Sequence, residues 1–143
     1  MYQNILIATD GSDIAMRAAE QGVALAKSVG AKVTAVTVTQ PFHWFGAELS
    51  AAARGAYEEG VERTVSRSLG AVAATAKAAN VACETVHVEQ DHPYIGIIET
   101  ASARNCDLIV MGSHGRGGLS AIVLGSHTVK VLTHAKIPVL VCR

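Results

Sequence analysis

One stretch of the chain, MGSHGRGGLSAIVLGS at residues 111–126, is rich in glycine and serine. Glycine costs backbone entropy, so five glycines directly after an apolar run need a structural or chemical reason. Gly112 and Gly115 are predicted to leave a strand with positive φ and to expose backbone N–H groups. Gly125 and Ser126 then open a helix, whose free N–H groups and positive dipole end attract anions. The spacing therefore predicts a phosphate site, and a flexible or dimer-forming loop is the alternative.

Three standard signatures of phosphate binding or nucleophilic catalysis fail by residue type. A Walker A loop needs a lysine after its last glycine, and no lysine occurs between residues 78 and 129. A dinucleotide fingerprint needs several glycines after the first strand, where ATDGSDIAM has one. A nucleophile elbow would centre on Ser113, but Met111 stands where its first glycine belongs. The stretch is thus neither a P-loop nor a hydrolase elbow.

Few charged side chains accompany the glycines. Arg116 is the nearby cation, so a bound triphosphate would be under-neutralised, and Mg²⁺ is expected to help. Asp10, after the first predicted strand, is the nearest candidate carboxylate for that ion or for a ribose hydroxyl. Ser12 and Asp13 compete to cap the following helix, which leaves Asp10 freer for a ligand. His114 is either a general base or phosphate contact, or an exposed loop histidine.

Short apolar runs alternate along the chain with longer segments of helical periodicity. The predicted strands span residues 5–8, 32–38, 81–88, 108–111 and 139–142, and the predicted helices span about 15–30, 50–79, 93–104 and 126–134. This alternation predicts an α/β fold, a doubly wound five-stranded parallel sheet with helices on both faces, in one domain over residues 1–143. The polar third strand is expected near a sheet edge. Ligands of such sheets bind beyond the carboxyl ends of strands, so residues 9–12 should meet the glycine stretch there.

Charge and composition exclude several classes of partner. Twelve basic and twelve acidic residues give a formal charge of +0, so no global field draws the chain to nucleic acid or to an anionic membrane. Aromatic residues make up 4% of the chain, too few for a base-stacking platform. No apolar run approaches a membrane span and the N-terminus lacks signal-peptide features, so a cytoplasmic location is expected. The three cysteines are expected to be buried thiols in a reducing compartment.

Residues outside the glycine stretch give weaker signals. Four histidines lack the spacing of metal ligands; they are His43, His87, His92 and His134. An aromatic cluster on the loop after the second strand is either a flap over the crevice or a subunit contact; it consists of Phe42, Trp44 and Phe45. The run Val139–Cys142 is a candidate edge strand, which pairing with a second copy of the chain would cover.

The pattern G-x2-G-x9-G-[ST] is matched in full by Gly112, Gly115, Gly125 and Ser126, and it resembles the nucleotide-binding motif of the universal stress protein family. NILIATDGSDIAMRAAEQGVALAK resembles that family's opening strand and helix, and CDLIVMGSHGRGGLSAIVLGS with HAKIPVLVCR resembles its closing half. The resemblance implies strand order 3-2-1-4-5 and binding of ATP or a related adenine nucleotide, AMP or ADP. It also implies a homodimer that pairs through the C-terminal strand, residues 138–142.

The resemblance further implies roles for individual residues. Ala8, Thr9 and Asp10 would lie near adenine and ribose, and the backbone of Val38 would meet the adenine edge. Met111 and Gly112 would border the ribose and the α-phosphate. The residues along the phosphates would be His114, Gly115, Arg116, Gly125, Ser126, His127 and Thr128.

Three functions remain open from the sequence. The first is a cytoplasmic stress-response module that holds ATP or AMP and signals through its bound state. The second is a slow Mg-dependent ATPase or phosphotransferase that uses Asp10 or His114, although the missing Walker lysine disfavours fast phosphoryl transfer. The third is a structural dimer with no ligand. The sequence assigns no catalytic residue and identifies no protein partner.

Overall fold

The computed structural model describes residues 1–41, 50–115 and 124–143, in which strands and helices alternate strictly. In chain order these elements are β1 (Asn4–Ala8), α1 (Asp13–Val29), β2 (Lys32–Thr39), α2 (Ala51–Ala78), β3 (Cys83–Glu89), α3 (Pro93–Ala103), β4 (Leu108–Gly112), α4 (Ser126–His134) and β5 (Val139–Cys142). Every element expected from the sequence is present. The aromatic cluster and Arg116 lie outside the described residues.

The five strands form one parallel sheet in the order β3-β2-β1-β4-β5, which confirms the expected fold class and strand order. β1 and β4 lie at the centre of the sheet, and every residue of both strands is buried. Burial on both faces explains why these two strands read as nearly continuous apolar runs. β3 is an edge strand, as its polar residues predict, and its exposure alternates along the strand.

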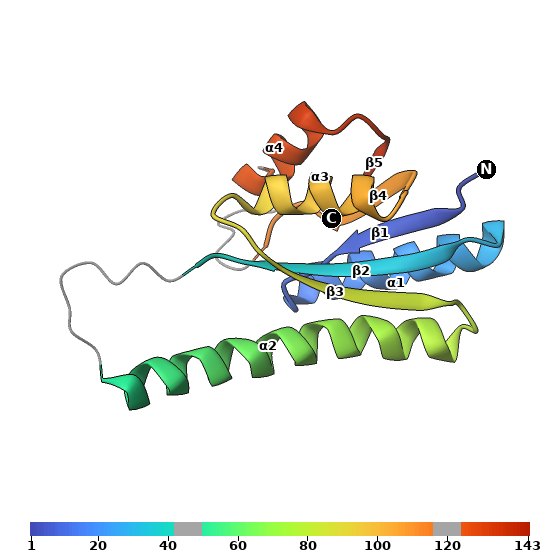
Figure 1. Cartoon of the computed structure of the whole chain (residues 1–143). Helices are drawn as coiled ribbons and strands as arrows, with labels where there is room; N and C mark the ends of the chain where they lie inside the picture. Colours follow the sequence, from blue (N-terminus) through green and yellow to red (C-terminus); the bar gives the residue numbers. More distant parts are fainter. Residues whose placement is uncertain (42–49, 116–123) are drawn as a thin grey trace.

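Helices cover both faces of the sheet (Figure 1). On one face α1 and α2 pack against a core that includes Ile5, Ile7 and Val33. On the other face α3 and α4 pack against a second core that includes Leu6 and Val36. Because successive side chains of a strand point to opposite faces, the five residues of β1 supply both cores.

α1 begins and ends at the residues that its sequence predicts. The Oγ of Ser12 accepts the N–H of Ala15 at 3.3 Å, and Gly30 closes the helix with a φ of 73°. Its small residues bring it close to the sheet, since a Cβ at Gly22 would lie 2.8 Å from Cδ1 of Ile7. The tight packing of α1 fixes the turn between β1 and this helix.

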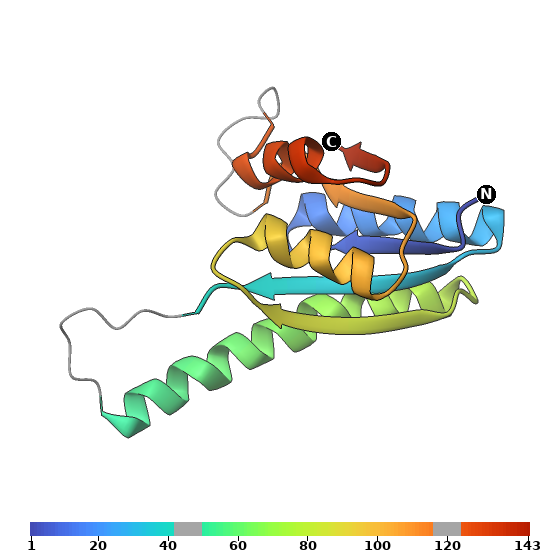
Figure 2. The same ribbon diagram turned by 45° about the horizontal axis from the view of Figure 1, so that its top comes forward.

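α2 is 28 residues long and packs on the sheet mainly through its second half, although the partly buried Val61 also contacts the core. Its buried residues are Val65, Ser68, Leu69, Val72 and Ala76. From Ala51 to Thr64 the helix contributes no buried residue. This first half extends past the end of the sheet (Figure 2).

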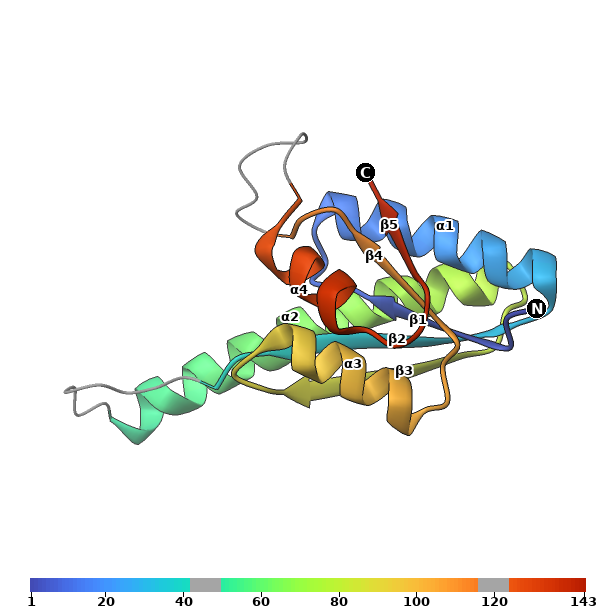
Figure 3. The same cartoon turned by 90° about the horizontal axis from the view of Figure 1, so that it is seen from above.

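The strand order reverses at β1, with β2 and β3 on one side and β4 and β5 on the other. At such a point the connections leave the sheet in opposite directions, which opens a crevice beyond the carboxyl ends of the strands. Viewed from above, α3 and α4 lie over the sheet on the side of this crevice (Figure 3). Within the described residues, no helix has the length and apolar character that crossing a membrane requires.

Candidate functional site

A cavity lies at the carboxyl ends of β1, β2 and β4, where the sequence predicts a site. Its lining consists of Ala8, Thr9, Asp10, Ala15, Val36, Val38, Pro93, Ile97, Met111, Gly112, His114, Gly115, His127 and Thr128. The cavity has a volume of about 110 Å³, below the roughly 300–1,000 Å³ of a typical ligand pocket. The described walls therefore have room to enclose only part of a ligand of ordinary size.

The turn after β1 is held by hydrogen bonds that orient Asp10. The N–H of Thr9 donates to the carbonyl of Val36 at 2.9 Å, and the hydroxyl of Thr37 donates to the carbonyl of Thr9 at 2.8 Å. Oδ1 of Asp10 accepts the N–H of Ser12 at 2.9 Å. As predicted, Ser12 caps α1 and Asp10 does not. The Asp10 carboxylate is thereby fixed at the lip of the cavity.

The motif glycines permit close contacts and do not adopt positive φ, which corrects the expectation for Gly112 and Gly115. Positive φ among the described glycines occurs at Gly11 and Gly30. A Cβ at Gly115 would lie 2.6 Å from Oδ2 of Asp10, and a Cβ at Gly125 would lie 3.0 Å from the Cα of His114. The first distance is too short for a Cβ unless the Asp10 carboxylate moves, so glycine here lets Asp10 and the loop approach each other.

Three hydrogen bonds fasten the two ends of the glycine stretch to each other and to the sheet. The N–H of Ser113 donates to the carbonyl of Cys142 at 2.7 Å, which ties the end of β4 to β5. The N–H of Gly125 donates to the carbonyl of Ser113 at 2.7 Å, and the hydroxyl of Thr128 donates to the carbonyl of Gly112 at 2.9 Å. The start of α4 is therefore held against the end of β4.

The electrostatic character of the cavity comes from α4 and a few side chains. α4 begins at Ser126, its N-cap Gly125 offers no side-chain acceptor, and its first turn holds no acidic residue. The first N–H groups of a helix lack intrahelical acceptors and carry a partial positive charge. Among the described lining residues Asp10 is the carboxylate, His114 and His127 are the basic groups, and neither Lys nor Arg occurs. The helix end is thus the main fixed source of positive potential in the described walls.

Burial keeps the nearby thiol neutral. It raises the pKa of Cys142, whose carbonyl anchors Ser113, and raises the pKa of Cys106 and of Cys83 as well. Cys106 and Cys142 are buried as expected, whereas Cys83 on the edge strand is only partly buried.

α3 forms the wall of the cavity that the sequence did not predict. Pro93 and Ile97 line the cavity from this helix. The helix lies close to β2. A Cβ added at Gly96 would be only 3.0 Å from both methyl groups of Val38, so the absence of a side chain at Gly96 permits this approach. A signal for this wall exists in the sequence, since Pro93 begins a helix and Ile97 follows one turn later. Its position over β2, however, depends on the strand order.

Most residues predicted for the site do lie together. Ten of them line the cavity, namely Ala8, Thr9, Asp10, Val38, Met111, Gly112, His114, Gly115, His127 and Thr128. Gly125 and Ser126 lie at the start of α4 and are not among the lining residues, and Arg116 lies outside the described residues. Ala15 and Val36 line the cavity along with the two α3 residues, although the sequence analysis did not single them out.

Comparison with known proteins identifies the family. A model of the universal stress protein family matches residues 1–143. The chain belongs to the universal stress protein family. A family member from Thermus aquaticus is 34% identical over 143 residues, with all of both chains covered.

Solved structures of other universal stress proteins share the fold. The Methanocaldococcus jannaschii protein MJ0577 is 25% identical and aligns with a TM-score of 0.80 over 99% of this chain and 96% of its own. A universal stress protein crystallised in complex with cAMP is 28% identical, with a TM-score of 0.72 over 99% of this chain and 97% of its own.

Proposed function

We propose that this universal stress protein binds an adenine nucleotide, ATP or a related AMP or ADP, in the cavity between β1, β4 and α4. The observation that carries the proposal is the close approach of Asp10 to Gly115, within a cavity that Gly112 and Gly115 of the glycine motif line. The cAMP complex of a family member that is 28% identical supports an adenine nucleotide as the ligand class. On this proposal the protein acts as a stress-response or signalling module through its bound state.

The lining suits the parts of a nucleotide in different places. Apolar side chains of Val36, Val38 and Ile97 form a surface for the base, and the Asp10 carboxylate is available to a ribose hydroxyl. The phosphates would lie towards Gly115 and the start of α4, where helix N–H groups favour anions. Mg²⁺ commonly binds through one or two carboxylates plus substrate phosphates, so the single carboxylate of Asp10 fits that role beside a triphosphate.

A serine–histidine pair lies beside the cavity but is not placed for catalysis in it. Oγ of Ser113 lies 3.1 Å from Nδ1 of His114, which is a nucleophile–base distance. Ser113, however, is only 2% exposed and does not line the cavity. A buried hydroxyl that does not line the cavity is not placed to attack a phosphate bound there, so this pair does not support a phosphotransferase.

Calorimetric titration of ATP with Mg²⁺, and of AMP, into nucleotide-stripped protein tests the proposal. Gly115→Ala should weaken binding by at least about tenfold, because the new Cβ would displace the Asp10 carboxylate. Gly70→Ala is the matched control, since a Cβ at Gly70 meets nothing within 4 Å. Circular dichroism should show that both variants are folded. Absence of saturable binding to the folded wild type, or equal affinity in Gly115→Ala, would refute the proposal.

A further inference from the structure

A second, larger groove lies between the first half of α2 and the sheet. One part has a volume of about 530 Å³ and runs from Asp10 past Thr37 and Val61. A second part of about 370 Å³ shares Tyr57 and Val61 with the first and continues to Glu89 on β3. Both volumes fall within the roughly 300–1,000 Å³ of ligand pockets. Unlike the cavity described above, the groove lies on the face of the sheet that α1 and α2 cover.

Small residues on α2 keep the groove open. Ala56 and Gly60 line it, and a Cβ at Gly60 would meet Nη2 of Arg63 at 3.9 Å and no atom of the sheet within 4 Å. The glycine at this position therefore does not serve close packing, in contrast to Gly22 of α1. Glycine in the middle of a helix costs about 1 kcal/mol relative to alanine. The helix thus contains a destabilising glycine at a position that lines the groove, where a larger residue would occupy more space.

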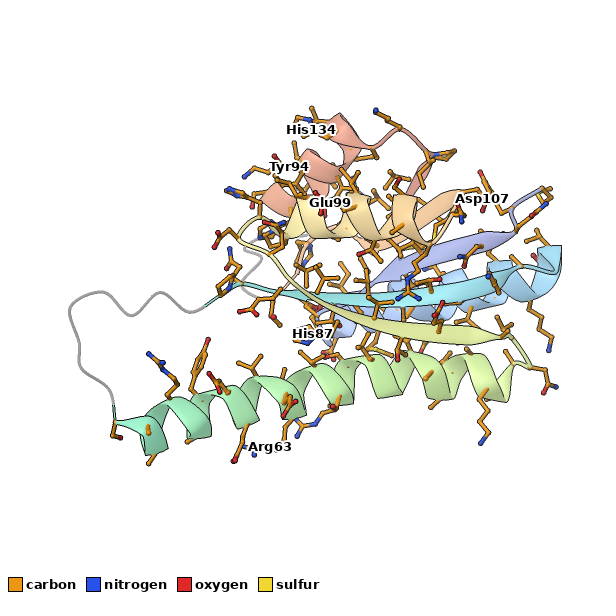
Figure 4. The ribbon with its side chains drawn as sticks, viewed as in Figure 1. Arg63, His87, Tyr94, Glu99, Asp107 and His134 are labelled. Carbon is orange, nitrogen blue, oxygen red and sulfur yellow. The ribbon has the colours of Figure 1, made fainter. Side chains whose placement is uncertain are left out.

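Among the described residues, acidic side chains outnumber basic ones in the lining of the groove. Asp10 lines the larger part, and Glu58, Glu62 and Glu89 line the smaller part. His87 is the one basic residue among the described residues that line either part, and its Nε2 is 2.7 Å from Oγ1 of Thr39. Figure 4 shows His87 between β3 and α2, and Arg63 on the outer side of α2. The groove therefore attracts a cation.

The spacing of the carboxylates distinguishes between kinds of cation. Within the described part of the chain no three His, Cys, Asp or Glu side chains converge as a metal site requires. The carboxylates instead lie apart along a groove whose surface includes Val38, Val61 and Val65. Tyr57, 41% exposed, adds an aromatic ring where the two parts join. Separated negative charges joined by apolar surface and an aromatic ring complement a chain of methylenes with several ammonium groups.

We propose that the groove between α2 and the sheet is a second ligand site and that it binds a linear aliphatic polyamine. The ammonium groups pair with the carboxylates, and the methylene segments lie on the valines and on Tyr57. The residues that line this groove differ from those that line the proposed nucleotide cavity, except for Asp10 and Val38, which line both.

Calorimetric titration of spermidine into the full-length protein at low ionic strength tests this site. Wild type should bind one molecule saturably, with an affinity that falls as salt rises. Gly60→Leu should abolish binding by filling the groove. Gly55→Leu is its matched control, because a Cβ at Gly55 meets nothing within 4 Å, a Cβ at Gly60 meets only Nη2 of Arg63 at 3.9 Å, and Gly55 lines neither part. Both leucines raise helix propensity, so both variants should fold.

A charge series provides a second test that does not depend on steric filling. The double variant Glu58→Gln, Glu62→Gln should weaken spermidine binding about fivefold or more, as expected for loss of two exposed ion pairs. Glu59→Gln removes a neighbouring carboxylate that pairs with Arg63 at 4.0 Å and lines neither part, so it should bind as wild type does. Three results would overturn the proposal: no saturable binding by wild type, unchanged binding by Gly60→Leu, or equal weakening by Glu59→Gln.

Discussion

A glycine contributes to this structure either by adopting positive φ or by letting another atom come close. Gly11 and Gly30 are of the first kind, and both lie at turns beside α1. Gly22, Gly96 and Gly115 are of the second kind, because an added Cβ at each would lie 3.0 Å or less from a neighbouring atom. Both kinds look alike in a sequence, which is why positive φ was wrongly expected at the start of the motif.

Gly22→Ala should therefore destabilise the protein although alanine is the better helix former. The new methyl group would lie 2.8 Å from Cδ1 of Ile7, a residue with no exposed surface. Overpacking of about 1–3 kcal/mol outweighs a propensity gain of about 1 kcal/mol. Gly70→Ala, where the space is open, should instead stabilise by about 0.5–1 kcal/mol. Urea unfolding measures both, and stabilisation by both alanines would show that α1 can move away from β1.

At the scale of elements, α2 consists of two halves with different support. The second half is anchored by buried residues such as Val65 and Val72, whereas the first half lies over a groove. Its N-terminus is capped by Ser50, whose Oγ accepts the N–H of Ala53 at 3.1 Å. A cap and local hydrogen bonds alone leave a helix of about 14 residues marginal in water.

Amide hydrogen exchange should divide α2 accordingly. Amides from Arg54 to Thr64 should exchange at least about tenfold faster than those from Val65 to Ala78, because this segment holds no fully buried residue and contacts the core through the partly buried Val61. Mass spectrometry of peptides from each half measures the difference, with a β1 peptide as the protected reference. Equal protection of both halves would mean that the first half is held by a contact outside the described chain.

The sequence predicted the helices and strands better than it predicted which of them contact one another. β1 and β4 were predicted within one or two residues, because strands buried on both faces have clear apolar runs. β3 begins two residues later than predicted, at Cys83, because Asn80 turns the chain with a φ of 57°. The contribution of α3 to the cavity was missed, because contact between Ile97 and the end of β2 follows from strand order and not from local spacing. The groove under α2 was missed for the same reason.

At the scale of the whole molecule, the β5 edge of the sheet exposes apolar side chains. Leu140 on this strand is 39% exposed, and Val129 and Leu132 of α4 are 45% and 43% exposed. An edge strand with apolar neighbours is a surface on which a second copy can pair. We propose two-fold pairing through β5 as the route to a homodimer.

Leu140→Lys should disrupt that dimer. Two-fold pairing brings the same strand of each copy together, so the substitution places like charges close to each other in the interface. Sedimentation velocity should show a dimer for wild type and a monomer for the variant at the same concentration. Ala74→Lys, on an exposed position of α2, is the control and should remain dimeric. A wild-type monomer, or a dimer that tolerates Leu140→Lys, would place the contact elsewhere or remove it.

Asp10 borders two cavities on opposite faces of the sheet, and its Oδ2 lies beside the glycine loop. A ligand that displaces this carboxylate on one face thereby alters a wall of the cavity on the other. Thermodynamic linkage requires that the factor by which a polyamine changes nucleotide affinity equals the factor by which the nucleotide changes polyamine affinity. Binding of the nucleotide and binding of the polyamine would then be thermodynamically coupled through the Asp10 side chain.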